Sequence, residues 1–155
     1  MDREETIRER TSPPIARAFV VLLLAACLAM PAAVAGRYSV AGIDDEAKVT
    51  QFLAALKDAV AKGQRERVVA LVALPLRVNT GKHHTYLRTQ KALLSAYDRV
   101  FDAEVRKALA AQRPGELFAN YQGVMVGDGQ IWFGLPAGTS ELRVLTVNTS
   151  AAAKK

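Results

Sequence analysis

Residues 117–133 read LFANYQGVMVGDGQIWF, and this stretch decides the fold. From residue 116 onward the hydrophobic period changes from 3.6 to 2, which is the pattern of strands with one buried face. The pair Asp128-Gly129 indicates a tight hairpin turn, because glycine tolerates the positive φ that such a turn needs. We therefore expect strands over residues 116–121, 123–126, 130–135 and 141–149, joined as an antiparallel meander.

The residues before this stretch have helical spacing. A first helix is predicted after the cap residues Asp44-Asp45-Glu46 and ends at Gly63. A second helix covers about 64–73 and is stopped by Pro75. The apolar stripe of the first helix consists of Val49, Phe52, Leu53, Leu56 and Val60.

Two further helices follow a short hairpin, whose strands lie around residues 76–78 and 84–88. Thr89 caps the third helix and Asp102 the fourth. The third helix has an apolar stripe made of Leu93, Tyr97, Val100 and Phe101. Because helices and meander are segregated along the chain, the sequence predicts an α+β fold, with the helices packed on one face of a curved antiparallel sheet.

The first 35 residues have the pattern of an export signal. Arg17 precedes the uncharged run of residues 18–30, Pro31 follows it, and Ala33-Val34-Ala35 provides a small-x-small cleavage site. The run is shorter than the roughly 20 residues of a membrane-spanning helix. We expect a periplasmic or secreted protein that begins at Gly36 and has no integral membrane segment after processing. A lipoprotein anchored through Cys27, in the pattern Leu24-Ala25-Ala26-Cys27, is the alternative.

Length and charge narrow the functional classes. A chain of 155 residues predicts one domain, with residues 36–43 as an irregular lead and 150–155 as a frayed tail. The net charge of +6 belongs entirely to residues 36–155, since the first 35 contain four Arg and four acidic residues. The basic residues are dispersed and do not alternate with aromatic ones, which favours a solvated surface and no nucleic-acid partner.

The order of elements, together with several motifs, resembles the nuclear transport factor 2-like superfamily over residues 44–149, and in particular its small exported bacterial members. The motifs are Phe52-Leu53-x-x-Leu56, Leu74-Pro75-Leu76-Arg77-Val78, Tyr97-Asp98-x-x-Phe101 and the stretch 117–133. The resemblance implies a cone-shaped, cystatin-like fold with a pocket between the long helix and the concave sheet. It implies no reaction, because members of the superfamily are isomerases, dehydratases, cyclases or binding proteins.

Aromatic and apolar side chains are the candidates for lining that pocket. They are Tyr97, Tyr121, Met125 and Trp132. Trp132 and Phe133 are neighbours on a strand and point to opposite faces, so at most one of the two reaches the concave side. Packing in the core is the alternative role for these residues.

Asp98 and Tyr97 are the candidates for catalysis. Asp102 lies four residues after Asp98 and would share its helix face, giving a carboxylate pair in which burial raises one pKa. Against this, Arg99 and Arg106 lie nearby and Asp102 is also a natural helix cap. No base and oxyanion pair of the isomerase kind can be matched, so we assign no catalytic residue.

Other chemical motifs give little. The adjacent His83 and His84 seldom share one ion and have no partner ligand in the sequence, so we expect no metal. The glycines between 123 and 129 precede no helix, which excludes a dinucleotide site, and we expect no cofactor. The sequence favours a binding module for a small molecule or protein, with a small isomerase or cyclase as the alternative. It leaves open whether the chain forms a homodimer.

Overall fold

A computed structural model describes residues 36–150. The predicted export signal with Cys27, and residues 151–155 of the predicted tail, lie outside the described residues. The lead contains a 3-10 turn, η1 (Ser39–Ala41), between the buried side chains of Tyr38 and Ile43. None of the helices in residues 36–150 has the length and apolar character needed to span a bilayer.

The first long helix, α2 (Glu46–Ala61), forms where the spacing predicts it. Its cap is Asp45, whose Oδ1 accepts hydrogen bonds from the N–H groups of Ala47 and Lys48 at 2.9 and 3.3 Å. These bonds satisfy two of the four donors that a helix N-terminus leaves free. Four residues of the predicted stripe are buried: Val49, Phe52, Leu53 and Leu56.

The second helix is shorter than the sequence predicts. Helix α3 (Arg65–Ala70) ends before Pro75, and the chain enters strand β1 (Val72–Thr80), which contains that proline. The prediction that Pro75 stops the helix is therefore wrong. The β-branched pair Val68 and Val69 is buried at the C-terminal end of α3, and the chain extends from Val72 onward.

The hairpin and the next two helices are confirmed. Strand β2 (His83–Leu87) returns along β1, and helices α4 (Gln90–Val100) and α5 (Ala103–Ala111) follow. Thr89 accepts a bond from Ala92 N–H at 3.1 Å, and Asp102 accepts one from Val105 N–H at 2.9 Å. Because α4 ends at Val100, Asp102 does not lie on the same helix as Asp98. The predicted face shared by these two carboxylates is wrong, and the cap role is correct.

The C-terminal meander contains β3 (Phe118–Asn120), β4 (Gly123–Val126), β5 (Ile131–Gly134) and β6 (Arg143–Thr149), after a 3-10 turn, η2 (Pro114–Glu116). Consecutive strands pair antiparallel, as predicted. The turn after β4 covers residues 127–130, and φ is positive at Gly127 and Gly129 and not at Asp128. The hairpin predicted at Asp128-Gly129, with positive φ at the glycine, is therefore confirmed.

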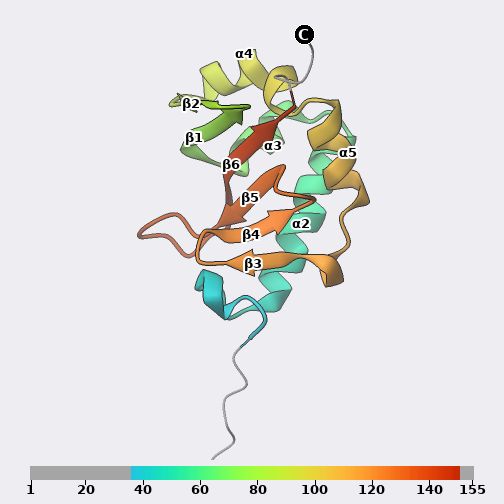
Figure 1. Cartoon of the computed structure of the whole chain (residues 1–155), viewed down its shortest axis with the longest axis vertical. Coiled ribbons are helices and arrows are strands. Elements are labelled where there is room, and N and C mark those ends of the chain that lie inside the picture. Colours follow the sequence, from blue (N-terminus) through green and yellow to red (C-terminus); the bar gives the residue numbers. More distant parts are fainter. Residues whose placement is uncertain (1–35, 151–155) are drawn as a thin grey trace, which may run out of the picture. The chain divides into compact units, whose positions relative to one another are not determined.

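The meander and the early hairpin form one six-stranded sheet in the order β2-β1-β6-β5-β4-β3. Its second and third strands, β1 and β6, form a parallel pair, in which Arg77 lies opposite Thr146 and Val78 opposite Val147. The predicted antiparallel sheet is thus corrected to a mixed one. Figure 1 shows the sheet in front of α2, with α4 and α5 along its upper and right-hand borders.

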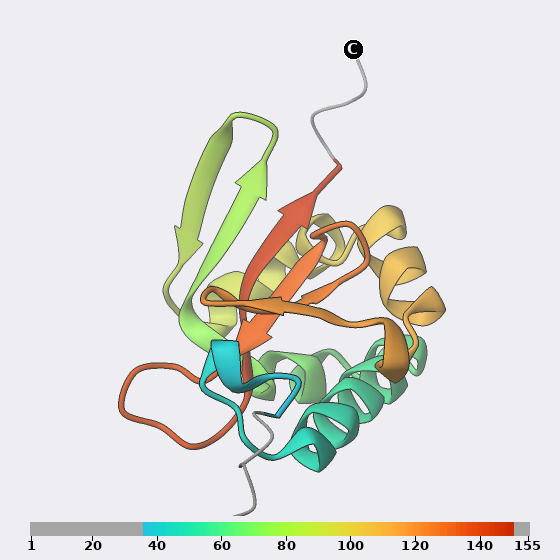
Figure 2. The ribbon, with the colours of Figure 1, turned by 60° about the horizontal axis from the view of Figure 1, so that its bottom comes forward.

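The core lies between this sheet and the helices. Phe52 of α2 packs on Phe133 of β5 with ring centroids 4.9 Å apart, so Phe133 faces the helices. In β4 and β5 the residues facing the helices are fully buried: Val124, Val126, Ile131 and Phe133. Figure 2 shows α2 and α5 on one side of the meander and the hairpin β1–β2 turned away from it. Within residues 36–150 the opposite face of the sheet carries no helix, and we call it the open sheet face.

Candidate functional site

A cleft of about 800 Å³ lies within the helical layer, and we call it the helical cleft. Residues of α2, α3, α4 and α5 line it: Lys57, Asp58, Val60, Ala61, Gly63, Arg65, Tyr97, Asp98, Arg106, Leu109 and Ala110. Its volume is within the range of small-molecule sites. Between α4 and the hairpin β1–β2 lies a second hollow, of about 270 Å³.

The chain forms this cleft because three helix ends meet there. Helix α2 ends at Ala61, and Gly63 takes a φ of +64° that turns the chain back into α3. Arg65, the first residue of α3, therefore lies beside the outer side of α4. Helix α5 begins after the corner at Asp102 and brings Arg106 to the same place.

One carboxylate joins the two arginines. Asp98 accepts a hydrogen bond from Arg65 Nη2 at 2.8 Å and one from Arg106 Nη2 at 2.7 Å. The Asp98 side chain is 61% exposed, and those of Arg65 and Arg106 are 48% and 42% exposed. Ion pairs this exposed contribute little stability, so their structural effect is to fix the positions of both guanidinium groups.

Both guanidinium groups also lie over one aromatic ring. The Cζ atoms of Arg65 and Arg106 are 5.1 and 5.6 Å from the ring centroid of Tyr97. Phe101 stacks on the same ring at 5.1 Å between centroids, with an angle of 28° between the ring planes. Cations within about 6 Å of an aromatic ring are attracted to its face. Tyr97, which is 2% exposed, thus anchors the polar rim of the cleft to its apolar base.

The hydroxyl of Tyr97 is buried, and no residue in the described part of the chain hydrogen-bonds to it. Burial raises the pKa of this hydroxyl above the ordinary value, although the nearby arginines act in the opposite direction. Tyr97 therefore stays protonated and neutral in the physiological range of pH. It can donate a hydrogen bond but does not act as a base.

Asp98 has the opposite character. The hydrogen bond from Arg106, with the charge of Arg65 added, holds the pKa of Asp98 below its usual range. A general base near neutral pH works best with a pKa raised toward 7. Asp98 is thus an exposed, ionised carboxylate whose contacts all weaken its basicity.

Asp102 is used structurally. Its Oδ1 caps α5, and its Oδ2 accepts bonds from the N–H and the hydroxyl of Ser150, both at 2.9 Å. Burial alone would raise the pKa of Asp102, but the bonds from Val105 and Ser150 outweigh it and lower the pKa. Ser150, which the sequence assigns to the tail, is held by this contact at the end of β6.

Sequence reasoning missed the cationic residues of the cleft. Lys57, Arg65 and Arg106 line it. The sequence placed Arg106 near Asp98 but made none of the three a candidate for binding. Lys57 Nζ donates to the Gln112 carbonyl at 2.7 Å, and Gln112 in turn binds Gly127 N–H through its side-chain oxygen at 2.7 Å. Lys57 and Arg65 lie 33 or more residues before Asp98 in the sequence, and Arg106 lies on a different helix. No local spacing of residues therefore identifies the three cations as a group.

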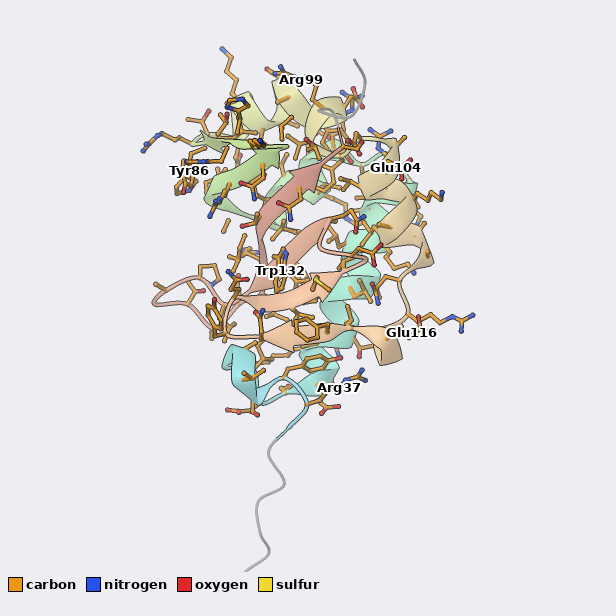
Figure 3. All side chains as sticks on the ribbon, viewed as in Figure 1. Arg37, Tyr86, Arg99, Glu104, Glu116 and Trp132 are labelled. Atoms are coloured by element: carbon orange, nitrogen blue, oxygen red, sulfur yellow. The ribbon has the colours of Figure 1, made fainter. Side chains whose placement is uncertain are left out.

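The predicted pocket residues do not meet at one site. Tyr97 belongs to the helical cleft, on the covered side of the sheet. Met125 and Trp132 are cross-strand partners on the open sheet face, and Figure 3 labels Trp132 in the middle of that face. Tyr121 lies in the turn between β3 and β4 and is 83% exposed.

The histidine pair lies on strand β2, with His83 and His84 both exposed. His84 contacts the ring of Tyr86 edge-on at 5.8 Å. Residues 36–150 contain no group of three or more His, Cys, Asp or Glu side chains placed to bind a metal ion. Among the described residues that line the helical cleft there is no His, Cys, Ser or Thr, so none of these side chains can serve there as a nucleophile.

Comparisons with known proteins add no assignment. No protein-family model matches the chain, and no curated protein matches it.

Proposed function

We propose that this chain is an exported binding module whose helical cleft holds a small organic anion with an apolar body. The observation that carries the proposal is the arrangement of Arg65 and Arg106, two guanidinium groups placed over the Tyr97 ring and oriented by the single carboxylate of Asp98. Such a pair is a preformed receptor for a carboxylate, sulfate or phosphate.

The arginines retain donors for a ligand. Each guanidinium carries five N–H groups, and each donates to Asp98 through one nitrogen. Asp98 neutralises only one of the two positive charges, and Lys57 lines the same cleft. The second carboxylate of the cleft, Asp58, is paired with Lys62 and Arg67. An incoming anion can therefore bind beside Asp98 and pair with the positive charge that Asp98 leaves on the two arginines.

The remainder of the cleft accepts an apolar group. Val60, Ala61, Leu109 and Ala110 contribute aliphatic side chains. Burying a chain of several methylenes against such a surface contributes about 0.8 kcal/mol for each CH₂. The combination fits an amphiphile with one acidic headgroup better than a fully polar metabolite.

Binding is favoured over catalysis by the state of Asp98. A carboxylate that is exposed, ionised and hydrogen-bonded by two arginines is a poor general base. The isomerase or cyclase alternative would have to use Tyr97 as a proton donor. Its raised pKa makes Tyr97 a weak acid, and the helical cleft offers no paired base.

Membership of the nuclear transport factor 2-like superfamily and export are parts of the same proposal. The sequence motifs 52–56, 97–101 and 117–133 support the family, and the α+β arrangement with helices on one face of the sheet is consistent with it. The charge and cleavage pattern of residues 1–35 supports export. Intact-mass measurement of the exported protein tests this: we expect an N-terminus at Gly36, whereas a diacylglycerol adduct on Cys27 would establish the lipoprotein alternative.

The binding proposal is tested with decanoate and its uncharged counterpart decanol. Displacement of the fluorescent probe anilinonaphthalene sulfonate measures both. We expect decanoate to displace the probe at least tenfold more strongly than decanol, and the double variant Arg65→Gln/Arg106→Gln to lose this preference. A tenfold loss corresponds to about 1.4 kcal/mol.

Arg67→Gln is the matched control. Arg67 lies on the same helix as Arg65 and pairs with Asp58 at 3.4 Å, but it does not line the cleft. It should retain the preference for decanoate. If the double variant retains its circular-dichroism spectrum and binds decanoate as the unmodified chain does, the anion site is elsewhere and the proposal is wrong.

A further inference from the structure

One row of side chains crosses the whole open sheet face. The register places one residue of each strand directly opposite its neighbour: Tyr86, Arg77, Thr146, Trp132, Met125 and Phe118, from β2 to β3. Phe118 is 53% and Tyr86 46% exposed, values that are unusual for large aromatic side chains. Figure 3 labels Tyr86 on the hairpin and Trp132 in the middle of the sheet. We call these six residues the cross-strand row.

A chain of hydrogen bonds lies beside this row. Arg77 Nε donates to Asn79 Oδ1 at 2.9 Å, and Asn79 Nδ2 donates to Asn148 Oδ1 at 2.6 Å. Asn148 Nδ2 donates in turn to the carbonyl of Gly129. The network connects β1, β6 and the turn after β4, and it orients Arg77 through one nitrogen only.

Arg77 has no carboxylate within ion-pairing distance among residues 36–150. Five other arginines do have one: Arg65, Arg67, Arg106, Arg113 and Arg143. Arg77 lines a hollow of about 320 Å³ together with Lys82, His83, His84 and amide or hydroxyl side chains. No acidic residue of the described chain lines it. An oriented arginine without a counter-ion, in a hollow free of acids, is complementary to an anion.

The two ends of the row differ in character. The cationic and amide groups lie on β1, β2 and β6, whereas Trp132, Met125 and Phe118 lie on β5, β4 and β3. Neighbouring strands are about 4.8 Å apart, so the row is roughly 24 Å long and Trp132 is about 10 Å from Phe118. A ligand that uses the whole row is therefore a short polymer with flat apolar faces and an acidic group.

We propose that the open sheet face binds an acidic polysaccharide, a glycan that contains uronic acid residues. The carboxylate of one sugar would bind Arg77, and the C–H faces of other sugars would pack on Tyr86, Trp132 and Phe118. Asn79, Asn148 and Thr146 provide donors and acceptors for hydroxyl groups. The distance between Trp132 and Phe118 is comparable with the length of an extended disaccharide, so alternate sugars would meet an aromatic ring.

Other occupants fit less well. A peptide that pairs by its backbone needs a strand edge, and the row lies on a face. Single-stranded nucleic acid needs cations along its whole length, and here the β3–β5 end of the row has none. A second copy of this chain would bury Arg77 against a face whose row carries no acid.

The test measures binding of polygalacturonate and alginate oligomers to the chain by titration calorimetry. The neutral control is methyl-esterified polygalacturonate, and oligothymidylate is the nucleic-acid control. We expect at least one uronate oligomer to bind, and its methyl ester or oligothymidylate to bind at least tenfold more weakly. Arg77→Gln and Trp132→Ala should each weaken uronate binding about tenfold or more.

Arg99→Gln is the matched control, because Arg99 is an exposed arginine on α4, away from the open sheet face. It should leave uronate binding unchanged, and so should Arg65→Gln/Arg106→Gln, which separates this surface from the helical cleft. The proposal is overturned if neither uronate binds, or if binding survives in Arg77→Gln with the near-ultraviolet circular dichroism intact. It is also overturned if oligothymidylate binds as tightly as the uronates, or if the chain is a dimer that Trp132→Ala dissociates.

Discussion

Replacing Tyr97 by Phe tests the account of the helical cleft most directly. The substitution removes one buried oxygen that has no hydrogen-bond partner in the described chain, and it keeps the ring that contacts Phe101, Arg65 and Arg106. A buried polar group without a partner costs about 1–3 kcal/mol. We therefore expect Tyr97→Phe to stabilise the folded state by about 1 kcal/mol, near the lower limit because the ring lines an open cleft.

Urea denaturation followed by circular dichroism measures this change. In a thermal denaturation of a domain of this size, the same 1 kcal/mol raises the melting temperature by about 3–6 °C. The sign is informative, because a tyrosine whose hydroxyl is hydrogen-bonded in the folded state loses stability on the same substitution. A loss of 1 kcal/mol or more in Tyr97→Phe would refute the view that its hydroxyl is unpaired.

The pH dependence gives an independent check on the same residue. The folded pKa of Tyr97 is raised by burial, so the unfolded chain loses this proton first as the pH increases. The stability linked to the neutral hydroxyl is complete below the unfolded pKa of about 10 and is lost as the pH rises through the folded pKa. Tyr97→Phe should lose less stability than the unmodified chain above pH 10.

The remaining predictions concern a glycine pair and two carboxylates. Gly123→Ala should destabilise the fold by roughly 2–4 kcal/mol in urea denaturation, because φ is +129° and a Cβ would lie 2.5 Å from the Phe133 carbonyl oxygen. Gly129→Val, at a φ of +104° with no neighbour nearer than 3.7 Å, should cost about 1–2 kcal/mol, and an equal loss at both sites would contradict this ranking. Asp102→Asn should reduce the loss of stability below pH 4. The lowered pKa of Asp102 contributes stability that is present above its unfolded pKa and lost as the pH falls through its folded pKa. If stability falls with acid equally in the variant and the unmodified chain, Asp102 does not contribute to the acid sensitivity. Asp98→Asn should change decanoate affinity by no more than about tenfold, toward tighter binding, because it frees both arginines; abolished binding would assign Asp98 to the ligand contact.

The helices and their caps were predictable because they depend on neighbours in sequence. Asp45, Thr89 and Asp102 accept bonds from N–H groups two or three residues away, and the stripe of α2 recurs every three or four residues. The end of α3 was not predictable from Pro75, because a proline is also accepted in a strand at a bulge, and the pairing of β1 with β6 shifts register between Val72 and Arg77.

The parallel pairing of β1 with β6 could not be inferred locally. Residues 78 and 147 are opposite each other in the sheet but 69 residues apart in the chain. The alternation of buried and exposed side chains along a strand is the same whether its partner runs parallel or antiparallel, so it does not predict the strand direction. The helical cleft was hidden for the same reason. Asp98 was singled out as an acid, yet its chemistry is determined by Arg65, 33 residues earlier, and Arg106, eight residues later.

The two proposed surfaces depend on one register. In β5 the alternation sends Phe133 toward Phe52 and Trp132 to the open sheet face, and a slip by one residue would exchange them. Gly123 fixes that register from β4, because its missing side chain admits the Phe133 carbonyl at a distance that any Cβ would block. The core that supports the helical cleft and the cross-strand row on the open sheet face are therefore fixed by the same close approach of β4 and β5.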